Sequence, residues 1–173
     1  SLVENLPLTV HAVNDAPRRT GGVLTPVDVD EDSANVTAVT LGLTGLAYAP
    51  GPAAASDEAG QTLAYTLTTI PSFVKLFKLD GASEITAGST VTAAELPGLK
   101  YKTVAEANGS GNLVLTITDS GSGTAPQVNT LVENLLLTVH AVNDAPRRTG
   151  GVLTPVDVDE DSANATAVTL GMA

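Results

Sequence analysis

Short runs of alternating apolar and polar residues recur along the chain, separated by clusters of Gly, Pro, Asn, Asp and Ser. Alternation with a period of two is typical of half-buried β-strands, and the sequence contains no long apolar pattern with the 3.6-residue period of a helix. The strands expected from this pattern cover residues 36–43, 63–70, 74–79, 98–103, 113–118 and 135–142. Roughly seven short strands in about 130 residues predict an all-β fold, specifically a β-sandwich.

One long segment of the sequence occurs twice. Residues 1–43 align with residues 130–172 at a shift of 129 (130 − 1), and only four positions differ: Ser1/Thr130, Pro7/Leu136, Val36/Ala165 and Leu43/Met172. A period of this size corresponds to one complete domain per repeat. We therefore expect the last strand and linker of a preceding repeat at 1–16, one complete domain at 17–144, and the first strands of a following repeat at 145–173.

The repeat also indicates which face of the strand at 135–142 is buried. Pro7 stands where the other copy has Leu136, and proline cannot donate to a β-ladder. The face that carries Leu136 and His140 is therefore the tolerant one, and the alternate positions should point into the core. The residues expected in the core are Leu135, Leu137, Val139 and Ala141, together with Leu113, Leu115 and Ile117 of the preceding strand.

Charge and composition argue against several classes of protein. Nineteen Asp and Glu residues against eight Lys and Arg residues give a net charge of −11. That charge disfavours nucleic acids and anionic membrane surfaces, both of which are bound through Lys and Arg. The absence of cysteine rules out disulfides and thiolate–metal sites, so a small extracellular domain would need another staple, usually a metal ion. No apolar run approaches the roughly 18 residues that span a bilayer, and we expect no membrane insertion.

The acidic residues gather between the expected strands and at their ends. The clusters are Asn14 and Asp15, Asp28 and Asp30 to Asp32, Asp57 and Glu58, Asp119, and the second copies at Asn143, Asp144 and 157–161. Like charges held together repel each other unless a cation lies among them, and Ca²⁺ takes about six to eight oxygen ligands of this kind. The alternative is that the acidic loops are solvated and keep the protein soluble. Composition alone favours neither.

Several segments resemble cadherin-type repeats. Residues 135–146, LLLTVHAVNDAP, resemble the last strand and linker of such repeats, with the pattern V-x-V-x-D-x-N-D-x-x-P. Residues 56–65, SDEAGQTLAY, resemble the D-x-D motif that precedes L-x-Y, and residues 117–121, ITDSG, resemble the A-x-D-x-G motif. The segment 63–101 is more similar to the cadherin-like repeats of chondroitin-sulfate-proteoglycan type, which end in VNDAP and are common in large tandem-repeat adhesins of bacteria. The resemblance covers residues 18–146.

The resemblance implies a Greek-key, immunoglobulin-like sandwich of an extracellular protein, at the cell surface or secreted. Its function would be mechanical, with Ca²⁺ ions joining each repeat rigidly to neighbouring repeats of the same chain. By the resemblance, the joint before the domain uses Asn14, Asp15, Asp57, Glu58 and Asp119, and the joint after it uses Glu31, Asn143 and Asp144. Because neither neighbouring repeat is complete in this sequence, we expect partial calcium occupancy that favours the first joint.

Two features depart from the family pattern. The L-D-R-E motif, which supplies two ligands in the family, has no clean match, and Glu106 and Glu95 are the candidates for its glutamate. The linker aspartate that usually precedes NDAP is replaced by Ala12 and Ala141. Fewer carboxylates predict fewer or weaker ions at each joint.

Three alternatives remain open from the sequence. The first is a module that recognises a carbohydrate or a protein, and the second is homophilic adhesion. Sugar sites usually present aromatic platforms, but the chain has no Trp, three Tyr and two Phe, of which Tyr65 and Tyr101 are expected in the core and Phe73 and Phe77 either in the core or exposed. The third is strand-swapped self-association, since residues 1–13 and 130–142 compete for one strand position. The paired carboxylates accompany no nucleophile motif, and we expect no enzymatic activity.

Overall fold

The computed structural model describes residues 1–121, 128–153, 155–160, 167 and 170. By its internal contacts the chain divides into two units, Ser1–Val142 and Asn143–Ala173. In the part that the structure describes, all strands and short 3-10 helices belong to the first unit. They are β1 (Arg18–Gly21), β2 (Val27–Asp30), β3 (Val39–Thr40), β4 (Ala47–Ala49), η1 (Ser56–Glu58), β5 (Leu63–Thr69), β6 (Val74–Phe77), β7 (Glu84–Ile85), β8 (Thr90–Val91), η2 (Leu96–Gly98), β9 (Lys100–Thr103), β10 (Gly109–Asp119) and β11 (Thr130–His140).

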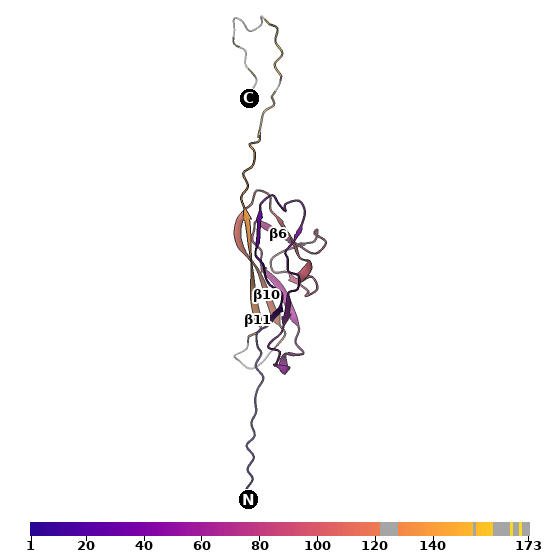
Figure 1. Ribbon diagram of the computed structural model, residues 1–173, viewed down its shortest axis with the longest axis vertical. Coiled ribbons are helices and arrows are strands. Elements are labelled where there is room, and N and C mark those ends of the chain that lie inside the picture. The colour runs from indigo at the N-terminus through magenta and orange to yellow at the C-terminus, as the bar shows by residue number, and fades with distance from the viewer. Residues whose placement is uncertain (122–127, 154, 161–166, 168–169, 171–173) are drawn as a thin grey trace. The chain divides into compact units, whose positions relative to one another are not determined.

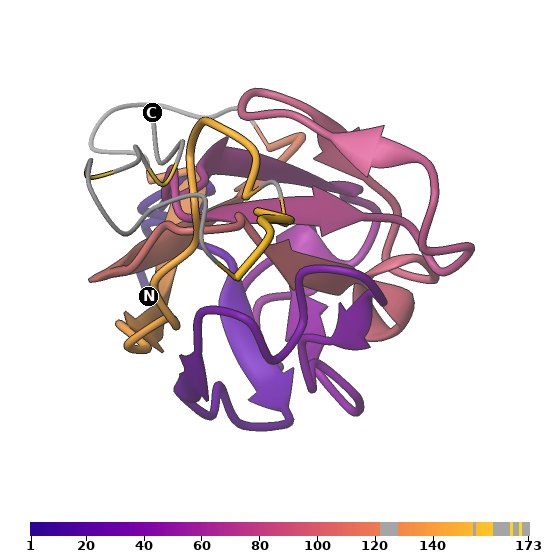
Figure 2. The ribbon, with the colours of Figure 1, turned by 90° about the horizontal axis from the view of Figure 1, so that it is seen from above.

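The strands of the first unit form two larger sheets and a small ribbon (Figure 1; end-on in Figure 2). The five-stranded sheet has the order β2-β11-β10-β5-β8, the four-stranded sheet has the order β3-β9-β6-β7, and β1 pairs with β4. Neighbouring strands are antiparallel except β2 and β11, which run parallel. The all-β prediction is therefore confirmed, while the immunoglobulin-like Greek-key topology stays a prediction.

One hydrophobic core joins the two larger sheets. Ile117 and Leu137 of the five-stranded sheet and Leu76 of the four-stranded sheet are each 0% exposed. The buried face expected for β10 and β11 is confirmed at Leu113, Leu115, Ile117, Leu135, Leu137 and Val139. The prediction for Ala141 is wrong, because β11 ends at His140 and Ala141 is exposed in the linker that follows.

The sequence pattern missed the shortest strands. β1, β2, β4, β7 and β8 have two to four residues each, and their pairing depends on backbone bonds that side-chain alternation does not reveal. The strand expected over residues 36–43 is reduced to Val39–Thr40. Gly42, with φ of +73°, interrupts it between the buried side chains of Leu41 and Leu43. The left-handed φ of Gly42 cannot be part of a regular strand, but it does not change the alternation of apolar residues in the sequence, so the pattern alone predicts too long a strand.

The two copies of the repeated strand have different structures. Thr130–His140 forms β11, between β10 and β2, with Leu137 fully buried. Residues 1–13, which are nearly identical in sequence, form no strand and are exposed, and Leu8, the counterpart of Leu137, is 86% exposed. The same residues are therefore ordered as a strand only where two neighbouring strands and a core receive them.

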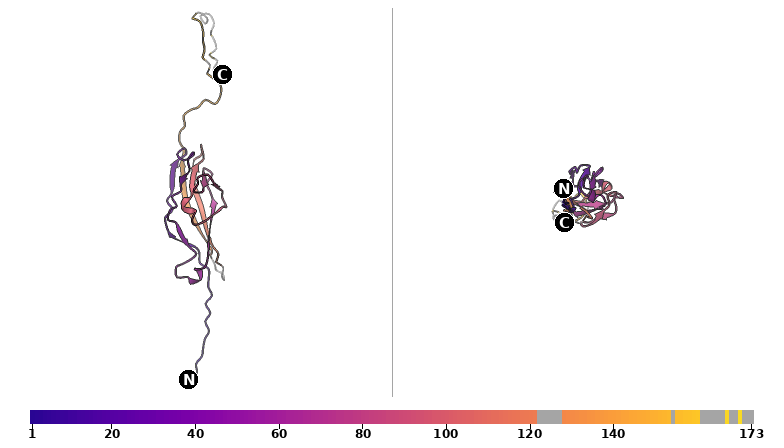
Figure 3. Two further views of the ribbon diagram at one scale, coloured as in Figure 1. Left: turned by 90° about the vertical axis from the view of Figure 1, so that its right-hand side faces the viewer. Right: turned by 90° about the horizontal axis from the view of Figure 1, so that it is seen from below.

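The long strands β10 and β11, drawn in salmon and orange, run along the length of the first unit (Figure 3). Thr118 pairs with Thr130 at one end of this hairpin, and Gly109 pairs with Val139 at the other. Eleven residues of strand span about 35 Å. We call the end with Asp119 the entry end, because linker residue Asn14 lies there, and the end with Glu31, where β2 and β11 finish, the exit end.

Candidate functional site

At the entry end, the linker residue Asn14 is buried against the domain and is only 4% exposed. Its Nδ2 donates to Asp119 Oδ1 at 3.1 Å and to the Val128 carbonyl at 2.8 Å. Its Oδ1 accepts a hydrogen bond from Gln61 Nε2 at 2.8 Å, and its carbonyl accepts one from the Val128 N–H at 3.1 Å. The amide of Asn14 is thus fully used, and it connects the start of β5 to the end of β10.

The next linker residue is held by a second carboxylate. The backbone N–H of Asp15 donates to Glu58 Oε1 at 2.9 Å, while the Asp15 side chain is exposed. Glu58 ends η1 and is 2% exposed. It packs closely on Gly51, where an added Cβ would lie 2.9 Å from Glu58 Cγ. Two consecutive linker residues are therefore bound by two buried carboxylates from distant parts of the chain.

Three buried acceptor oxygens at the entry end have no hydrogen-bond partner among the described residues: Glu58 Oε2, Gln61 Oε1 and Asp119 Oδ2. They belong to the three side chains that hold Asn14 and Asp15. A buried polar atom left without a partner costs about 1–3 kcal/mol, and more when it is charged. A donor set made only of oxygens suits a hard cation such as Ca²⁺ or Mg²⁺.

The entry end alone offers two buried carboxylates and one amide. Over the residues that the structure describes, no three Asp, Glu or His side chains gather as a metal-binding group. A cation bound there would need further oxygens, either from the exposed carboxylate of Asp15 or from outside this domain.

At the exit end, Glu31 is 4% exposed and follows β2 directly. Its Oε1 accepts a hydrogen bond from the Val142 N–H at 2.7 Å, and its Oε2 is 3.5 Å from Asn108 Nδ2. Its backbone N–H donates to the His140 carbonyl at 3.0 Å, and its carbonyl accepts a hydrogen bond from Thr103 Oγ1. Glu31 therefore holds the chain at the point where it leaves β11.

The remaining candidates from the sequence lie outside these two clusters. Asp57 is exposed on η1, next to the buried Glu58. Asn143 and Asp144 are exposed and belong to the second unit, where Asn143 Nδ2 lies 3.4 Å from the Asp144 carbonyl. Glu106 is exposed, with a left-handed φ of +59°.

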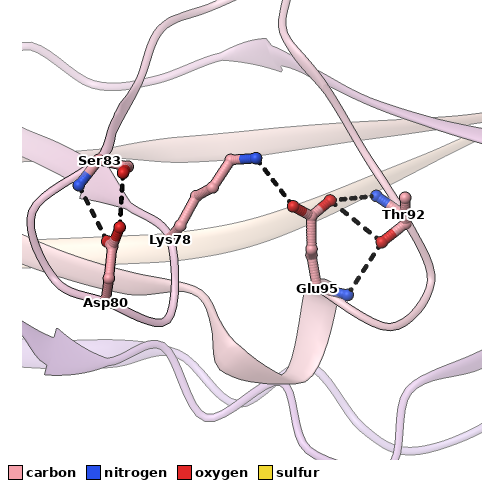
Figure 4. Close-up of polar contacts among 5 residues, drawn as sticks. All are labelled: Lys78, Asp80, Ser83, Thr92 and Glu95. Carbon is pink, nitrogen blue, oxygen red and sulfur yellow. Dashed lines mark hydrogen bonds and ion pairs between the residues drawn. The ribbon is translucent and has the colours of Figure 1, made fainter.

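Glu95, the other candidate for the missing glutamate, stabilises a turn (Figure 4). Its Oε1 accepts a hydrogen bond from Lys78 Nζ at 2.8 Å, and its Oε2 accepts from the N–H of Thr92 at 2.8 Å. The Glu95 N–H returns a bond to Thr92 Oγ1 at 3.2 Å, which completes a capping box before η2. These bonds lower the pKa of Glu95 to about 2, and bonds from Ser83 and Ala82 lower that of Asp80 to about 2.

The acid stability of the domain should reflect these two carboxyl groups. Their folded-state pKa values lie below the unfolded values of 4.5 for Glu95 and 3.8 for Asp80, so their stabilising contribution is present above those values and is lost as the pH falls toward about 2. We expect the free energy of unfolding to fall between pH 4.5 and 2, and Glu95→Gln to flatten that dependence. Urea unfolding at several pH values measures how the free energy of unfolding depends on pH in the wild type and in Glu95→Gln. The same pH dependence in both proteins would contradict the lowered pKa of Glu95.

The sequence did not single out two residues of the entry end. Gln61 supplies both a donor to Asn14 and an unpartnered oxygen, but an isolated Gln in a loop carries no recognisable signal. Gly121 lies so close to Asn14 that an added Cβ would fall 1.5 Å from Asn14 Oδ1. In the sequence it was only the last residue of ITDSG, where a glycine usually indicates a turn.

Comparison with protein-family models, curated proteins and solved structures gives no match. No helix in the described part of the chain is long and apolar enough to cross a membrane.

The aromatic residues and one open groove are the remaining places where a ligand could bind. None of the five aromatic residues is exposed, and Phe77 lies beneath Lys102, whose Nζ is 5.2 Å from the ring centroid. An open groove of about 650 Å³ lies beside Tyr48 and Tyr65, and the described residues that line it include no Asp, Glu, His, Lys or Arg. The aromatic residues therefore form no exposed platform, and the described lining of the groove contains no acid–base pair.

Proposed function

We propose that this chain is a spacer module from an array of tandem β-sandwich repeats in an extracellular surface adhesin, and that calcium ions stiffen the joints between repeats. The observation that carries the proposal is the set of three buried, unpartnered oxygens on Glu58, Gln61 and Asp119, at the point where the linker enters the domain. The 129-residue repeat supports it, because the same linker follows the domain at Asn143 and Asp144.

The two ends of the domain complement each other across a joint. Glu31 accepts a hydrogen bond from the N–H of Val142. Val142 corresponds to Val13 in the first copy of the repeat. In an array, the Glu31 counterpart of the preceding repeat would therefore hold Val13, next to Asn14 and Asp15. Three consecutive linker residues would then be held by three carboxylates from two domains. This adds the third carboxylate that the entry end lacks.

The ion would be held by Glu58, Gln61 and Asp119, with Asp15 and the preceding repeat completing its oxygen ligands. It would neutralise the buried carboxylates and couple adjacent domains through the linker. Asp57 is close enough in sequence to join Glu58 at the ion, as the cadherin resemblance implies. Extracellular location follows from the same proposal.

Direct ligand recognition and homophilic adhesion have less support. Four of the five aromatic residues are buried and Tyr48 is half-buried, and all four lysines lie in or next to β6 and β9, where Lys75 and Lys78 pair with Glu84 and Glu95. The open groove beside Tyr48 has no charged residue among its described lining. We accordingly propose a mechanical function that is not catalytic.

The test is thermal unfolding of this chain in excess calcium, in magnesium and in excess chelator. A ligand that binds only the folded state at a concentration of about 100 Kd stabilises it by about 2.7 kcal/mol. We expect calcium to raise the melting temperature relative to chelator and magnesium to have less effect, since Mg²⁺ demands a stricter octahedral site. The proposal fails if calcium shifts neither this chain nor a chain with two complete repeats.

A further inference from the structure

We infer that the linker is locked to the domain that follows it without any metal ion, so that the hinge of each joint lies before Asn14. The lock consists of Asn14 and the backbone of Asp15, held by Glu58, Gln61, Asp119 and Val128. The position of the hinge in an array rests on the proposed function, whereas the lock itself depends only on the contacts within this chain.

Asp119, Glu58 and Gln61 each use one polar side-chain atom to hold the linker, and in each the other polar atom has no hydrogen-bond partner among the described residues. Asp119 uses Oδ1 for Asn14 and leaves Oδ2, and Glu58 uses Oε1 for Asp15 and leaves Oε2. Gln61 uses Nε2 for Asn14 and leaves Oε1. The hydrogen bonds that hold the linker are therefore complete before an ion arrives, and an ion on the remaining oxygens would not have to break them.

Gly121 fits the pocket closely around the Asn14 amide. A Cβ at this position would lie 1.5 Å from Asn14 Oδ1 and 2.5 Å from Gln61 Nε2, so no other residue leaves room for the bound amide. The Gly121 N–H also donates to Asp119 Oδ1 at 2.9 Å and helps to orient that carboxylate toward Asn14. The walls of the pocket around the Asn14 amide are thus supplied by residues of the domain itself.

The second copy of the linker provides an internal comparison. Asn143 and Asp144 have the same sequence context as Asn14 and Asp15, yet both are exposed. On the exit side, the side chain of Glu31 holds Val142 through one hydrogen bond of 2.7 Å. The linker is therefore bound more firmly to the domain after it than to the domain before it, which places the hinge between Val13 and Asn14.

Hydrogen exchange of individual backbone amides tests the lock in the intact chain. In excess chelator, we expect the N–H groups of Asp15 and Val128 to exchange at least about tenfold more slowly than that of Asp144, the exposed copy. Adding calcium should change the protection of Asp15 only slightly.

Gly121→Ala should bring the exchange of Asp15 close to that of Asp144 in chelator, because the added methyl group displaces the Asn14 amide. Gly60→Ala is the matched control at the same end, since nothing lies within 4 Å of a Cβ built there. The exchange of amides in the middle of β10 shows that each variant remains folded.

The outcomes separate the lock from the proposed function. If Asp15 exchanges as fast as Asp144 in chelator and slows only in calcium, linker docking depends on the ion and the lock is refuted, while the calcium-stiffened spacer stands. If Asp15 is protected in chelator and calcium changes neither exchange nor melting temperature, the lock stands and the calcium function fails. Unchanged protection of Asp15 in Gly121→Ala would also refute the lock.

Discussion

Leu137→Ala is expected to lower the free energy of unfolding by about 2–5 kcal/mol, the usual cost of truncating a fully buried leucine. Leu137 is 0% exposed, lies in the central part of β11, and belongs to the core cluster that joins the two larger sheets. Its truncation removes apolar contacts and leaves a cavity in the core between the two larger sheets. Urea unfolding of the intact chain measures the change.

The repeat supplies the matched control for this prediction. Leu8 occupies the same position in the first copy and is 86% exposed, so Leu8→Ala should change stability by less than about 0.5 kcal/mol. Equal losses in the two variants would contradict the structure. That result would instead indicate that residues 1–13 are buried in solution, as strand exchange between two chains would require.

Asp119→Asn should remove most of the calcium-dependent rise in melting temperature. At a calcium concentration of about 100 Kd that rise corresponds to about 2.7 kcal/mol, or roughly 10 °C for a domain of this size. Asparagine keeps the shape of the side chain and can still accept from Asn14 at Oδ1, but it replaces the unpartnered Oδ2 by an NH2 group. In chelator the variant should have about the stability of the wild type, because Oδ1 keeps its hydrogen bonds to Asn14 and Gly121 and one unpartnered polar atom replaces another.

Two further variants make this measurement specific. Asp30→Asn removes one exposed carboxylate at the exit end and should leave the calcium effect unchanged. Asp57 is the exposed neighbour of Glu58 and was expected at the joint from the sequence. A smaller calcium-dependent rise in melting temperature in Asp57→Asn would show that Asp57 helps to bind the ion. A full calcium response in Asp119→Asn would show that Asp119 is not a ligand.

The fold could be predicted where side-chain alternation and burial coincide. The inner faces of β10 and β11 followed directly from period two, since both strands are long and have one buried face. The two-residue strands β7 and β8 could not be predicted, because backbone pairing with a neighbour defines them more than their own side chains do. Nor could the sequence distinguish the two copies of the repeated strand, whose difference lies entirely in the presence of β10 and β2 beside one of them.

The candidate site was predicted in part. Asn14, Asp15, Glu58 and Asp119 were expected at one joint, and the structure brings them together through direct hydrogen bonds. The use of the Asn14 side chain as a bound amide was not foreseen, since the sequence suggested only an oxygen ligand. Gln61 and Gly121 complete the pocket by proximity in space, and their spacing of 60 residues (121 − 61) contains no pattern that would connect them.

In the array that we propose, the parallel pairing of β2 with β11 would determine how the domain responds to a stretching force. The chain enters at one end of the unit and leaves at the other, so a stretching force pulls β2 toward the entry end and β11 toward the exit end. Leu137 to His140 pair with Val27 to Asp30 side by side, and the force therefore acts along these strands and shears them past each other. Ladder bonds loaded in this direction share the force and have to fail together, whereas the bonds of a hairpin peeled from its open end fail one at a time. The time for which the domain stays folded under force then depends on its rate of forced unfolding more than on its equilibrium stability.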